Sequence, residues 1–198
     1  ILENVKNAPP IRRALFNICS SAAMNYTQNR DYLRGSSLQI EPEKTGSMII
    51  TKIRSFVLAT LLFIPYQLSK PILSKVKGAL GNRIRFAFSG AGALPYHIDR
   101  FFYSIGLPIL ETYGMSETTG VSCLRDFSRP VIGTLGKNLT EIELKLVDEK
   151  GNIVTEPNVK GVAHHRGQHI MMGYYKAPDK TNAVLTEDGW LNSGDILI

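Results

Sequence analysis

The run Tyr113-Gly-Met-Ser-Glu-Thr-Thr-Gly120 combines the chemically different groups that a nucleotide ligand needs. Tyr113 offers a ring on which a base can stack, and the hydroxyls of the run can donate hydrogen bonds to phosphate. Glu117 offers the hard carboxylate oxygen that Mg²⁺ prefers. The run predicts a nucleotide-binding loop or, more simply, a helix N-cap in which Ser116 or Thr118 satisfies free backbone N–H groups.

A second run, Ser89-Gly-Ala-Gly-Ala93, has very small side chains. A flat ligand could lie directly against the backbone of Gly90, Ala91 and Gly92. The run lacks the GxGxxG spacing of a dinucleotide fold, so a purely structural strand-to-helix turn is the alternative.

The elements around these runs predict a βαβ unit. Residues 83–88 form a short β-rich run, Pro95 stands where a helix begins, and residues 108–113 form a second strand. The helix between them carries one apolar face, made of Ile98, Phe101, Phe102 and Ile105, and stops at Gly106. Two parallel strands place both small-residue and hydroxyl-rich loops at their carboxyl ends, where ligands bind in open α/β sheets.

Beyond residue 130 the pattern is typical of strands. The expected elements are a strand at 141–147 that returns at 153–154, short strands at 161–165 and 169–172, and a small helix at 178–185.

The first part of the chain is predicted to be helical. Pro9-Pro10 breaks a first helix, and a second spans 11–32 with Leu15, Ile18, Ala22 and Tyr26 at helical spacing. After a polar connection at 35–47, we expect a helix pair interrupted by Pro65 and Pro71 and closed by Gly78 and Gly81.

The excess of positive over negative charge lies entirely in this first part. Residues 1–85 carry a net charge of +9 and residues 86–198 carry −3. No stacking aromatic pattern or zinc finger accompanies the cations, so nucleic acid is not the expected partner. The apolar stretch 56–66 with basic flanks is too short to span a bilayer; it fits a helix on an anionic membrane surface or a core helix with solvated flanks.

The composition is that of a globular protein. The 198 residues include 43% hydrophobic and 20% charged residues, which excludes a disordered chain, and two cysteines are too few for a disulfide scaffold. Cys19 and Cys123 therefore predict reduced thiols and a cytoplasmic location. His164, His165 and His169 lack a cysteine or carboxylate at ligand spacing, so zinc is not expected.

The sequence has no initiator Met and ends within an apolar run. We therefore expect an interior piece of a longer protein.

The motifs together resemble a known family. The Tyr113–Gly120 run, the upstream Ser-Gly-Ala-Gly-Ala-Leu-Pro95, and the downstream Gly173-Tyr-Tyr175 and Asp188-Gly-Trp-Leu-Asn-Ser-Gly-Asp195 are similar to the adenylate-forming (AMP-binding) superfamily, most of all its long-chain fatty acyl-CoA synthetases. The resemblance implies an α/β fold, part of a large N-terminal domain. We expect a basic helical segment (1–82), a βαβ unit with nucleotide loops (83–130) and a β-rich subdomain (131–198).

The resemblance also implies roles for particular residues. Tyr113 would stack on adenine, Asp195 would accept hydrogen bonds from the ribose diol, Ser116 would bond the α-phosphate and Glu117 would hold Mg²⁺; Ser116 and Glu117 are the expected catalytic pair. The remaining nucleotide-binding residues would be Gly90, Ala91, Gly92, Glu111, Thr112 and Gly114, with Gly92 and Ala93 also bordering the acyl tunnel.

The implied reaction uses ATP, Mg²⁺ and coenzyme A. A fatty carboxylate would form acyl-AMP, and the thiol of coenzyme A would then displace AMP. The family's phosphate loop would precede residue 1, and the hinge and catalytic lysine would follow residue 198, so the piece alone is expected to be inactive. An enzyme that loads an acyl carrier protein is the alternative within the family, and a membrane-surface module acting through residues 48–77 is the alternative from another class.

Overall fold

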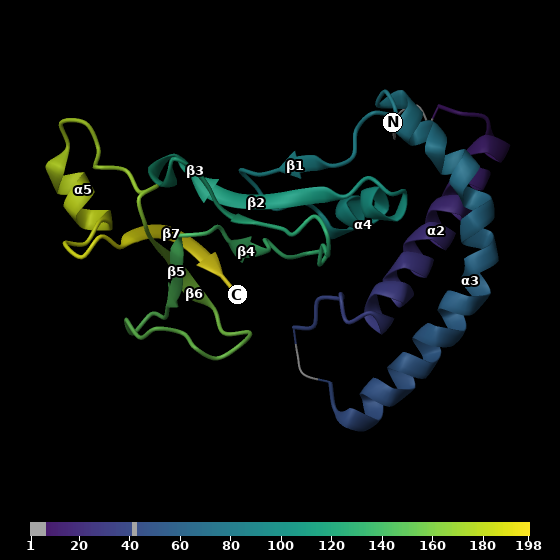
Figure 1. Ribbon diagram of the computed structural model, residues 1–198, viewed down its shortest axis with the longest axis horizontal. Coiled ribbons are helices and arrows are strands. Elements are labelled where there is room, and N and C mark those ends of the chain that lie inside the picture. Colours follow the sequence, from purple (N-terminus) through teal and green to yellow (C-terminus); the bar gives the residue numbers. More distant parts are fainter. Residues whose placement is uncertain (1–6, 41–42) are drawn as a thin grey trace. The chain divides into compact units, whose positions relative to one another are not determined.

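The computed structural model describes residues 7–40 and 43–198. The expected break of a first helix before Pro9 therefore concerns residues that lie mostly outside the described part. The elements, labelled in Figure 1, are α2 (Pro10–Leu33), α3 (Thr45–Ala79), β1 (Ala87–Ser89), α4 (Tyr96–Ser104), β2 (Ile109–Met115), the 3₁₀ turn η1 (Ser116–Thr118), β3 (Gly120–Leu124), β4 (Lys137–Asn138), β5 (Glu143–Val147), β6 (Gly161–Arg166), α5 (Pro178–Val184) and β7 (Leu191–Leu197).

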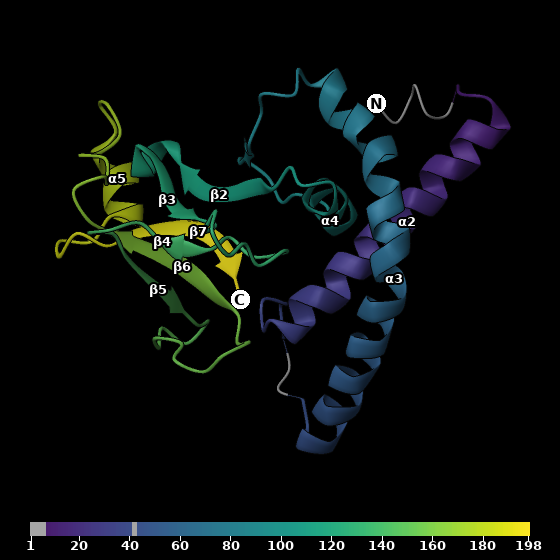
Figure 2. The ribbon, with the colours of Figure 1, turned by 45° about the vertical axis from the view of Figure 1, so that its right-hand side comes forward.

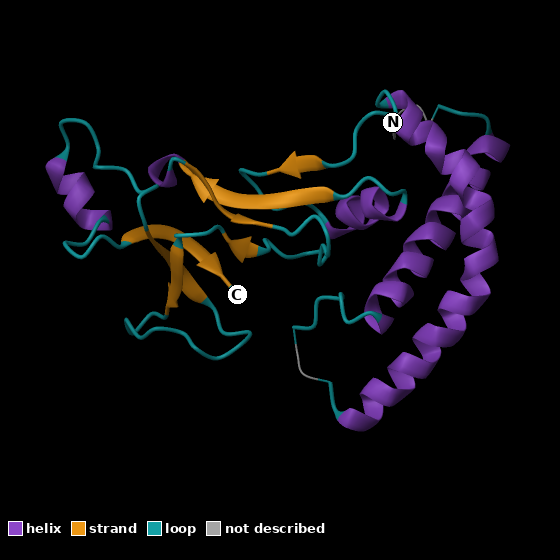
Figure 3. Cartoon of the chain, viewed as in Figure 1, coloured by secondary structure: helices purple, strands orange, loops and turns teal. Residues whose placement is uncertain are grey.

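The chain forms two compact units, each assembled from several segments. The first unit comprises Ile1–Ser89, Ala93–Leu110 and Asp126–Thr134, and the second comprises Gly90–Gly92, Glu111–Arg125 and Leu135–Ile198. Helices dominate the first unit and strands the second (Figure 3). The sequence predicts three continuous segments that meet at residues 82 and 130. That division stays a prediction, because each compact unit combines segments that are separated in the sequence.

Helix α2 matches the predicted span, but its buried face differs from the predicted one. The buried residues are Cys19, Ser20, Ala23, Thr27 and Asp31, whereas Leu15 and Ile18 are exposed. Small side chains let α2 approach α3 closely, and the two helices lie side by side in Figures 1 and 2. The core there joins Cys19, Ala23 and Leu73. Apolar spacing therefore located the helix but not its packed side.

Helix α3 corrects the expected helix pair. It runs through Pro65 and Pro71 as one helix of 35 residues, about 50 Å long at 1.5 Å per residue. Each proline removes one backbone hydrogen bond. The face against α2 nevertheless continues past Pro65 through buried Ser69, Leu73 and Val76, so packing offsets that cost.

The 56–66 stretch thus belongs to a much longer element than the sequence indicated. By length and composition, α3 could cross a membrane, and only 6% of its most apolar 18-residue stretch is buried. The run 56–66 alone is too short to span a bilayer, but the 35-residue helix that contains it is long enough.

Helix α4 begins after Pro95, as predicted, and joins the first unit through polar groups. Its fully buried residues are Asp99, Arg100 and Ser104, while the predicted apolar face is only half-buried. Arg100 Nη1 donates to Asp31 Oδ2 of α2 at 2.6 Å, with both side chains buried. The β1–α4–β2 order was expected, and β1 is next to β2 in the strand order.

The second unit contains two antiparallel arrangements. Strands β2, β3 and β4 are successive neighbours, and β5, β6 and β7 form a three-stranded sheet. Strand β2 continues through Gly114 and Met115, which the sequence placed in a loop, because β3 pairs with them. The predicted strand at 169–172 is wrong, since these residues form a turn and a bend after Gly167. The predicted small helix is confirmed as α5.

Candidate functional site

The tight β2–η1–β3 hairpin presents the hydroxyl-rich run. At Gly114 a Cβ would lie 1.8 Å from the carbonyl oxygen of Gly120, so only glycine allows the strands to approach this closely. Thr118 is buried, and its hydroxyl bonds the carbonyls of Met115 and Gly120 at 3.0 and 2.8 Å. The same hydroxyl accepts a hydrogen bond from Met115 N–H at 3.0 Å, so the interpretation as a cap of a free N–H group holds for Thr118. Thr118 fixes the hairpin, and Ser116 is exposed at its tip.

Glu117 is held in place from a distant part of the chain. Its Oε1 accepts a 2.7 Å hydrogen bond from the Tyr174 hydroxyl, and its backbone carbonyl accepts one from Met171 N–H at 2.8 Å. The hydrogen bond to Glu117 raises the pKa of Tyr174. Tyr174 therefore belongs to the site. The sequence singled out the Gly173-Tyr-Tyr175 motif, but no local pattern assigned this contact.

Tyr113 and Asp195 meet although 82 residues separate them. The Tyr113 hydroxyl lies 2.9 Å from Asp195 Oδ2 and 3.2 Å from Ser193 Oγ. Burial, together with the hydrogen bond to Asp195 and the Asp195 charge, raises the pKa of Tyr113 to about 12, although the hydrogen bond with Ser193 lowers it. The phenol is thus protonated at neutral pH and donates to the carboxylate.

His165 lies behind this pair and is fully buried. Its Nε2 is 3.5 Å from the Tyr113 hydroxyl, and the two rings are 5.4 Å apart. Burial lowers the pKa of His165 to about 4. The neighbouring His169 and His164 also lower this pKa, whereas the charge of Asp195 raises it. The imidazole is consequently neutral at pH 7.

The small-residue loop and β2 are also in contact. A Cβ on Gly90 would lie 2.5 Å from the Thr112 Oγ1, so the loop backbone approaches β2 directly. Ala91 has a φ of +65°, a conformation that costs a non-glycine residue energy, and Gly90, Ala91 and Gly92 are exposed. The exposed backbone here is the feature that the sequence predicted for contact with a flat ligand.

Glu111 has a different environment from the other residues that the sequence predicts to bind the nucleotide. Its side chain is buried and accepts a 2.7 Å bond from Arg125 Nη2 on the strand end opposite. Only its backbone can therefore take part in a binding surface.

Histidines do not form a metal centre in the described part of the chain. No group of three or more His, Cys, Asp or Glu residues is arranged there to hold a metal ion. His169 Nε2 instead lies 3.2 Å from Ser122 Oγ. Glu117 is a single carboxylate, and a Mg²⁺ ion held through one carboxylate would take its other ligands from phosphates and water.

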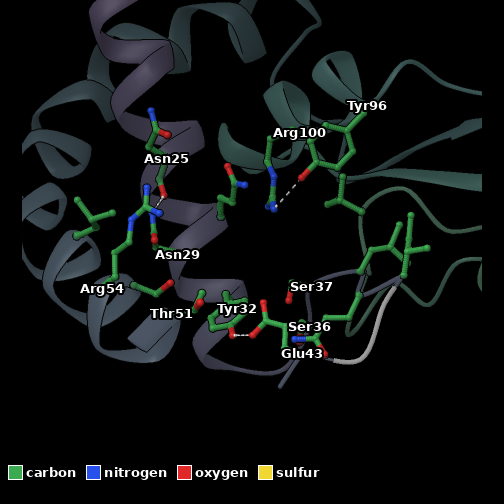
Figure 4. A pocket seen from close by; sticks show the side chains of 17 residues that line it. Asn25, Asn29, Tyr32, Ser36, Ser37, Glu43, Thr51, Arg54, Tyr96 and Arg100 are labelled. Carbon is green, nitrogen blue, oxygen red and sulfur yellow. Dashed lines mark hydrogen bonds between the residues drawn. The ribbon is translucent and has the colours of Figure 1, made fainter. Parts of the chain in front are cut away.

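A polar cavity of about 670 Å³ lies in the first unit, between α2, α3 and α4 (Figure 4). None of the predicted site residues lines it. Its wall groups bond one another: Tyr32 donates to Glu43, and Arg100 donates to Asp31 behind the wall.

The comparisons with known proteins show the family. The AMP-binding enzyme family matches residues 14–175. The chain is 40% identical over 140 residues to the long-chain-fatty-acid–[acyl-carrier-protein] ligase AEE15, chloroplastic, of Arabidopsis thaliana, covering 70% of this chain and 19% of that protein. It is 30% identical over 200 residues to the probable acyl-activating enzyme 16, chloroplastic, of the same plant, covering 99% of this chain and 27% of that protein.

Solved structures show the same fold. A benzoate CoA ligase from Burkholderia xenovorans LB400 matches with a TM-score of 0.52 and 27% identity, covering 57% of this chain and 23% of that one. The anthranilate CoA ligase AuaEII in complex with anthranoyl-AMP matches with a TM-score of 0.52 and 25% identity, covering 57% and 22%.

The fold and the matched motifs define an α/β portion of an adenylate-forming enzyme. The chain belongs to the AMP-binding enzyme family. It spans about a fifth to a quarter of the length of the two Arabidopsis relatives.

Proposed function

We propose that this chain is part of an ATP-dependent long-chain fatty acid ligase. The observation that carries the proposal is the hydrogen-bonded pair of Tyr113 and Asp195, which places an aromatic ring and a carboxylate together beside the Glu117 hairpin. The names of relatives support the substrate class: besides the chloroplastic ligase, a putative fatty-acid–CoA ligase fadD11 of Mycobacterium tuberculosis is 37% identical over 129 residues.

The nucleotide roles follow from chemistry and exposure. Tyr113 stacks on the base, and the exposed Asp195 accepts hydrogen bonds from the two ribose hydroxyls, for which a carboxylate is the best bidentate acceptor. The bare backbone of Gly90, Ala91 and Gly92, with that of Glu111, Thr112 and Gly114, borders the base. Ser116 donates to the α-phosphate from the hairpin tip.

The metal role falls to Glu117. Its carboxylate is partly exposed and is oriented by Tyr174, which suits a hard-cation ligand next to phosphates. When bound, Mg²⁺ supplies positive charge against the phosphate oxygens. Glu117 holds that charge in place, and the Ser116 hydroxyl adds a fixed donor.

The reaction has two balanced steps. A fatty carboxylate oxygen attacks the α-phosphorus of ATP, forming acyl-AMP while pyrophosphate leaves with the electron pair of the broken P–O bond. A thiolate then attacks the acyl carbon, forming a thioester while AMP leaves. The thiol acceptor is coenzyme A in this proposal. An acyl carrier protein is the second candidate, because AEE15 is named for that acceptor.

The test is made on the full-length protein with palmitate as the acid. We expect ATP–pyrophosphate exchange that depends on palmitate, followed by palmitoyl transfer when coenzyme A is added. Transfer only to acyl carrier protein would replace the proposed acceptor. No exchange with palmitate or shorter carboxylic acids would overturn the proposal.

We also propose peripheral membrane contact through residues 48–77 of α3. Large apolar side chains stay exposed along it: Ile49, Ile50, Ile53, Phe56, Val57, Leu61, Phe63, Ile64 and Leu68. Lys52, Lys70 and Lys75 are exposed on the same helix and complement an anionic surface. Such a surface is a source of fatty acid.

The cytoplasmic location expected from the sequence stays a prediction. Both cysteines are free and buried.

Replacing Leu61, Ile64 and Leu68 of the full-length protein by Gln should remove most binding to phosphatidylglycerol vesicles, because it removes the apolar surface. Replacing Lys52, Lys70 and Lys75 by Gln should weaken binding by at least about tenfold and reduce its salt dependence. Co-sedimentation measures both. Ile11→Gln with Ile18→Gln on exposed positions of α2 is the matched control. Unchanged binding in the α3 variants, or no binding by the wild type, contradicts membrane contact.

A further inference from the structure

The Tyr113 hydroxyl takes part in more hydrogen bonds than its single proton can serve. It lies within 3.5 Å of Asp195 Oδ2, Ser193 Oγ and His165 Nε2. A carboxylate can only accept, so the phenol proton goes to Asp195, at the shortest of these distances. The lone pairs of the Tyr113 oxygen then need a donor.

Ser193 cannot supply that proton. Its hydroxyl donates to the carbonyl of Ala163 at 2.7 Å, and its oxygen already accepts from the backbone N–H of Asp195 at 3.1 Å. His165 Nε2 is therefore the donor that remains among these neighbours.

The burial of His165 selects the same arrangement. Its Nδ1 is buried and has no hydrogen-bond partner among the described residues. With the proton on Nε2, Nδ1 is an unpaired acceptor; with the proton on Nδ1, it would be an unpaired buried N–H donor, which proteins tolerate less well. The network thus assigns the neutral tautomer with hydrogen on Nε2.

We infer that His165 is a positioning residue for nucleotide binding, acting through the Tyr113 hydroxyl to set the direction of its hydrogen bond to Asp195. This inference rests on the proposed function. A donor chain runs from His165 on β6 through Tyr113 on β2 to Asp195 on β7, linking the base platform to the ribose carboxylate across three strands. No contact between His165 and the nucleotide is required.

The test is a double-mutant cycle on ATP binding by the full-length protein, measured by isothermal titration calorimetry with MgATP. His165→Val should raise the Kd by about three- to tenfold, the range of one neutral hydrogen bond. In a Tyr113→Phe background, which keeps the ring but lacks the hydroxyl, the same change should raise the Kd less than about twofold. The KM for ATP should rise while kcat stays within about twofold.

Two further variants separate positioning from a loss of structure. His165→Gln carries an amide N–H and should restore binding to within about twofold of the wild type. His164→Val, the same change one residue earlier on β6, should leave the Kd unchanged. If His165→Val does not fold, His165→Phe, which keeps a ring but has no N–H donor, replaces it in both backgrounds with the same expected changes in Kd.

The two possible failures are distinguishable. A wild-type protein that does not bind MgATP overturns the proposed function itself. Normal binding by the wild type, with His165→Val weakening it equally in the wild-type and Tyr113→Phe backgrounds or not at all, overturns only the positioning role. A His165→Gln variant as weak as His165→Val also contradicts it.

Discussion

Replacing Glu117 by alanine in the full-length protein should lower palmitate-dependent ATP–pyrophosphate exchange by at least about a hundredfold, the scale of removing one preorganised electrostatic group from a reaction centre. The physical reason is charge. In the proposed reaction, a carboxylate approaching the α-phosphorus meets the negative phosphates, and a cation held by Glu117 would offset that repulsion. Glu117→Gln keeps the shape and the bond to Tyr174 but removes the charge, so it should lose nearly as much. The measurement is kcat and KM at several Mg²⁺ concentrations.

Two controls locate the effect at the carboxylate. Tyr174→Phe removes only the hydroxyl that orients Glu117 and should cost about three- to tenfold, partly recovered by more Mg²⁺. Glu149→Ala removes a charge from an exposed turn of the same unit and should leave exchange unchanged. Glu117→Ala retaining more than half of the wild-type rate would show that the cation is held elsewhere.

The candidate site was largely predictable because its motifs are local in sequence. The Tyr113–Gly120 run and the loop at Gly90 were singled out by residue type, and Asp195 by resemblance. Contacts between distant segments were not predictable in this way. The bonds from Tyr174 to Glu117 and from His165 to Tyr113 depend on how β6 and the segment after it fold back on the hairpin. Single-sequence patterns carry no such information.

The fold was predicted best where residues close together in the sequence determine the local structure. Proline at or just before the first turn marked α2, α4 and α5 correctly. The same residue misled for α3, because continuous packing on α2 outweighs two missing hydrogen bonds. Strand β7 contains Asn192, Ser193, Gly194 and Asp195, which have poor strand propensity, and it is a strand because β6 pairs with it. Pairing is non-local, and the strand was accordingly missed.

Glu111 and Arg125 illustrate the same limit inside the site. The sequence placed Glu111 at the base rim without a side-chain partner. In the structure, Glu111 near the start of β2 and Arg125 just after β3 form a buried pair at 2.7 Å, with side chains 7% and 1% exposed. The backbone repeats the contact, since Arg125 N–H donates to the Glu111 carbonyl at 3.1 Å. The pair therefore closes the open end of the hairpin that carries the site.

Removing one partner of this pair should strongly destabilise the hairpin. Arg125→Met leaves the Glu111 carboxylate buried without its cation, which costs about 3–5 kcal/mol in comparable buried pairs. Hydrogen exchange of peptides covering residues 109–125 in the full-length protein should accelerate by at least about a hundredfold, because local opening becomes easier by that energy. The double change Glu111→Leu with Arg125→Met removes both charges and should recover most of the protection.

The exposed pair of Arg166 and Glu143 is the matched control for this prediction. It joins β5 to β6 with two bonds of 2.9 and 2.6 Å, geometry as good as that of the buried pair. Water solvates both partners when the bond breaks, so Arg166→Met should change exchange in β5 and β6 only slightly. Equal acceleration in the two single variants would mean that geometry, rather than burial of the charge, determines the strength of such pairs here. A double variant as unprotected as Arg125→Met would mean that the hairpin needs the ion pair itself and not merely the absence of a lone buried charge.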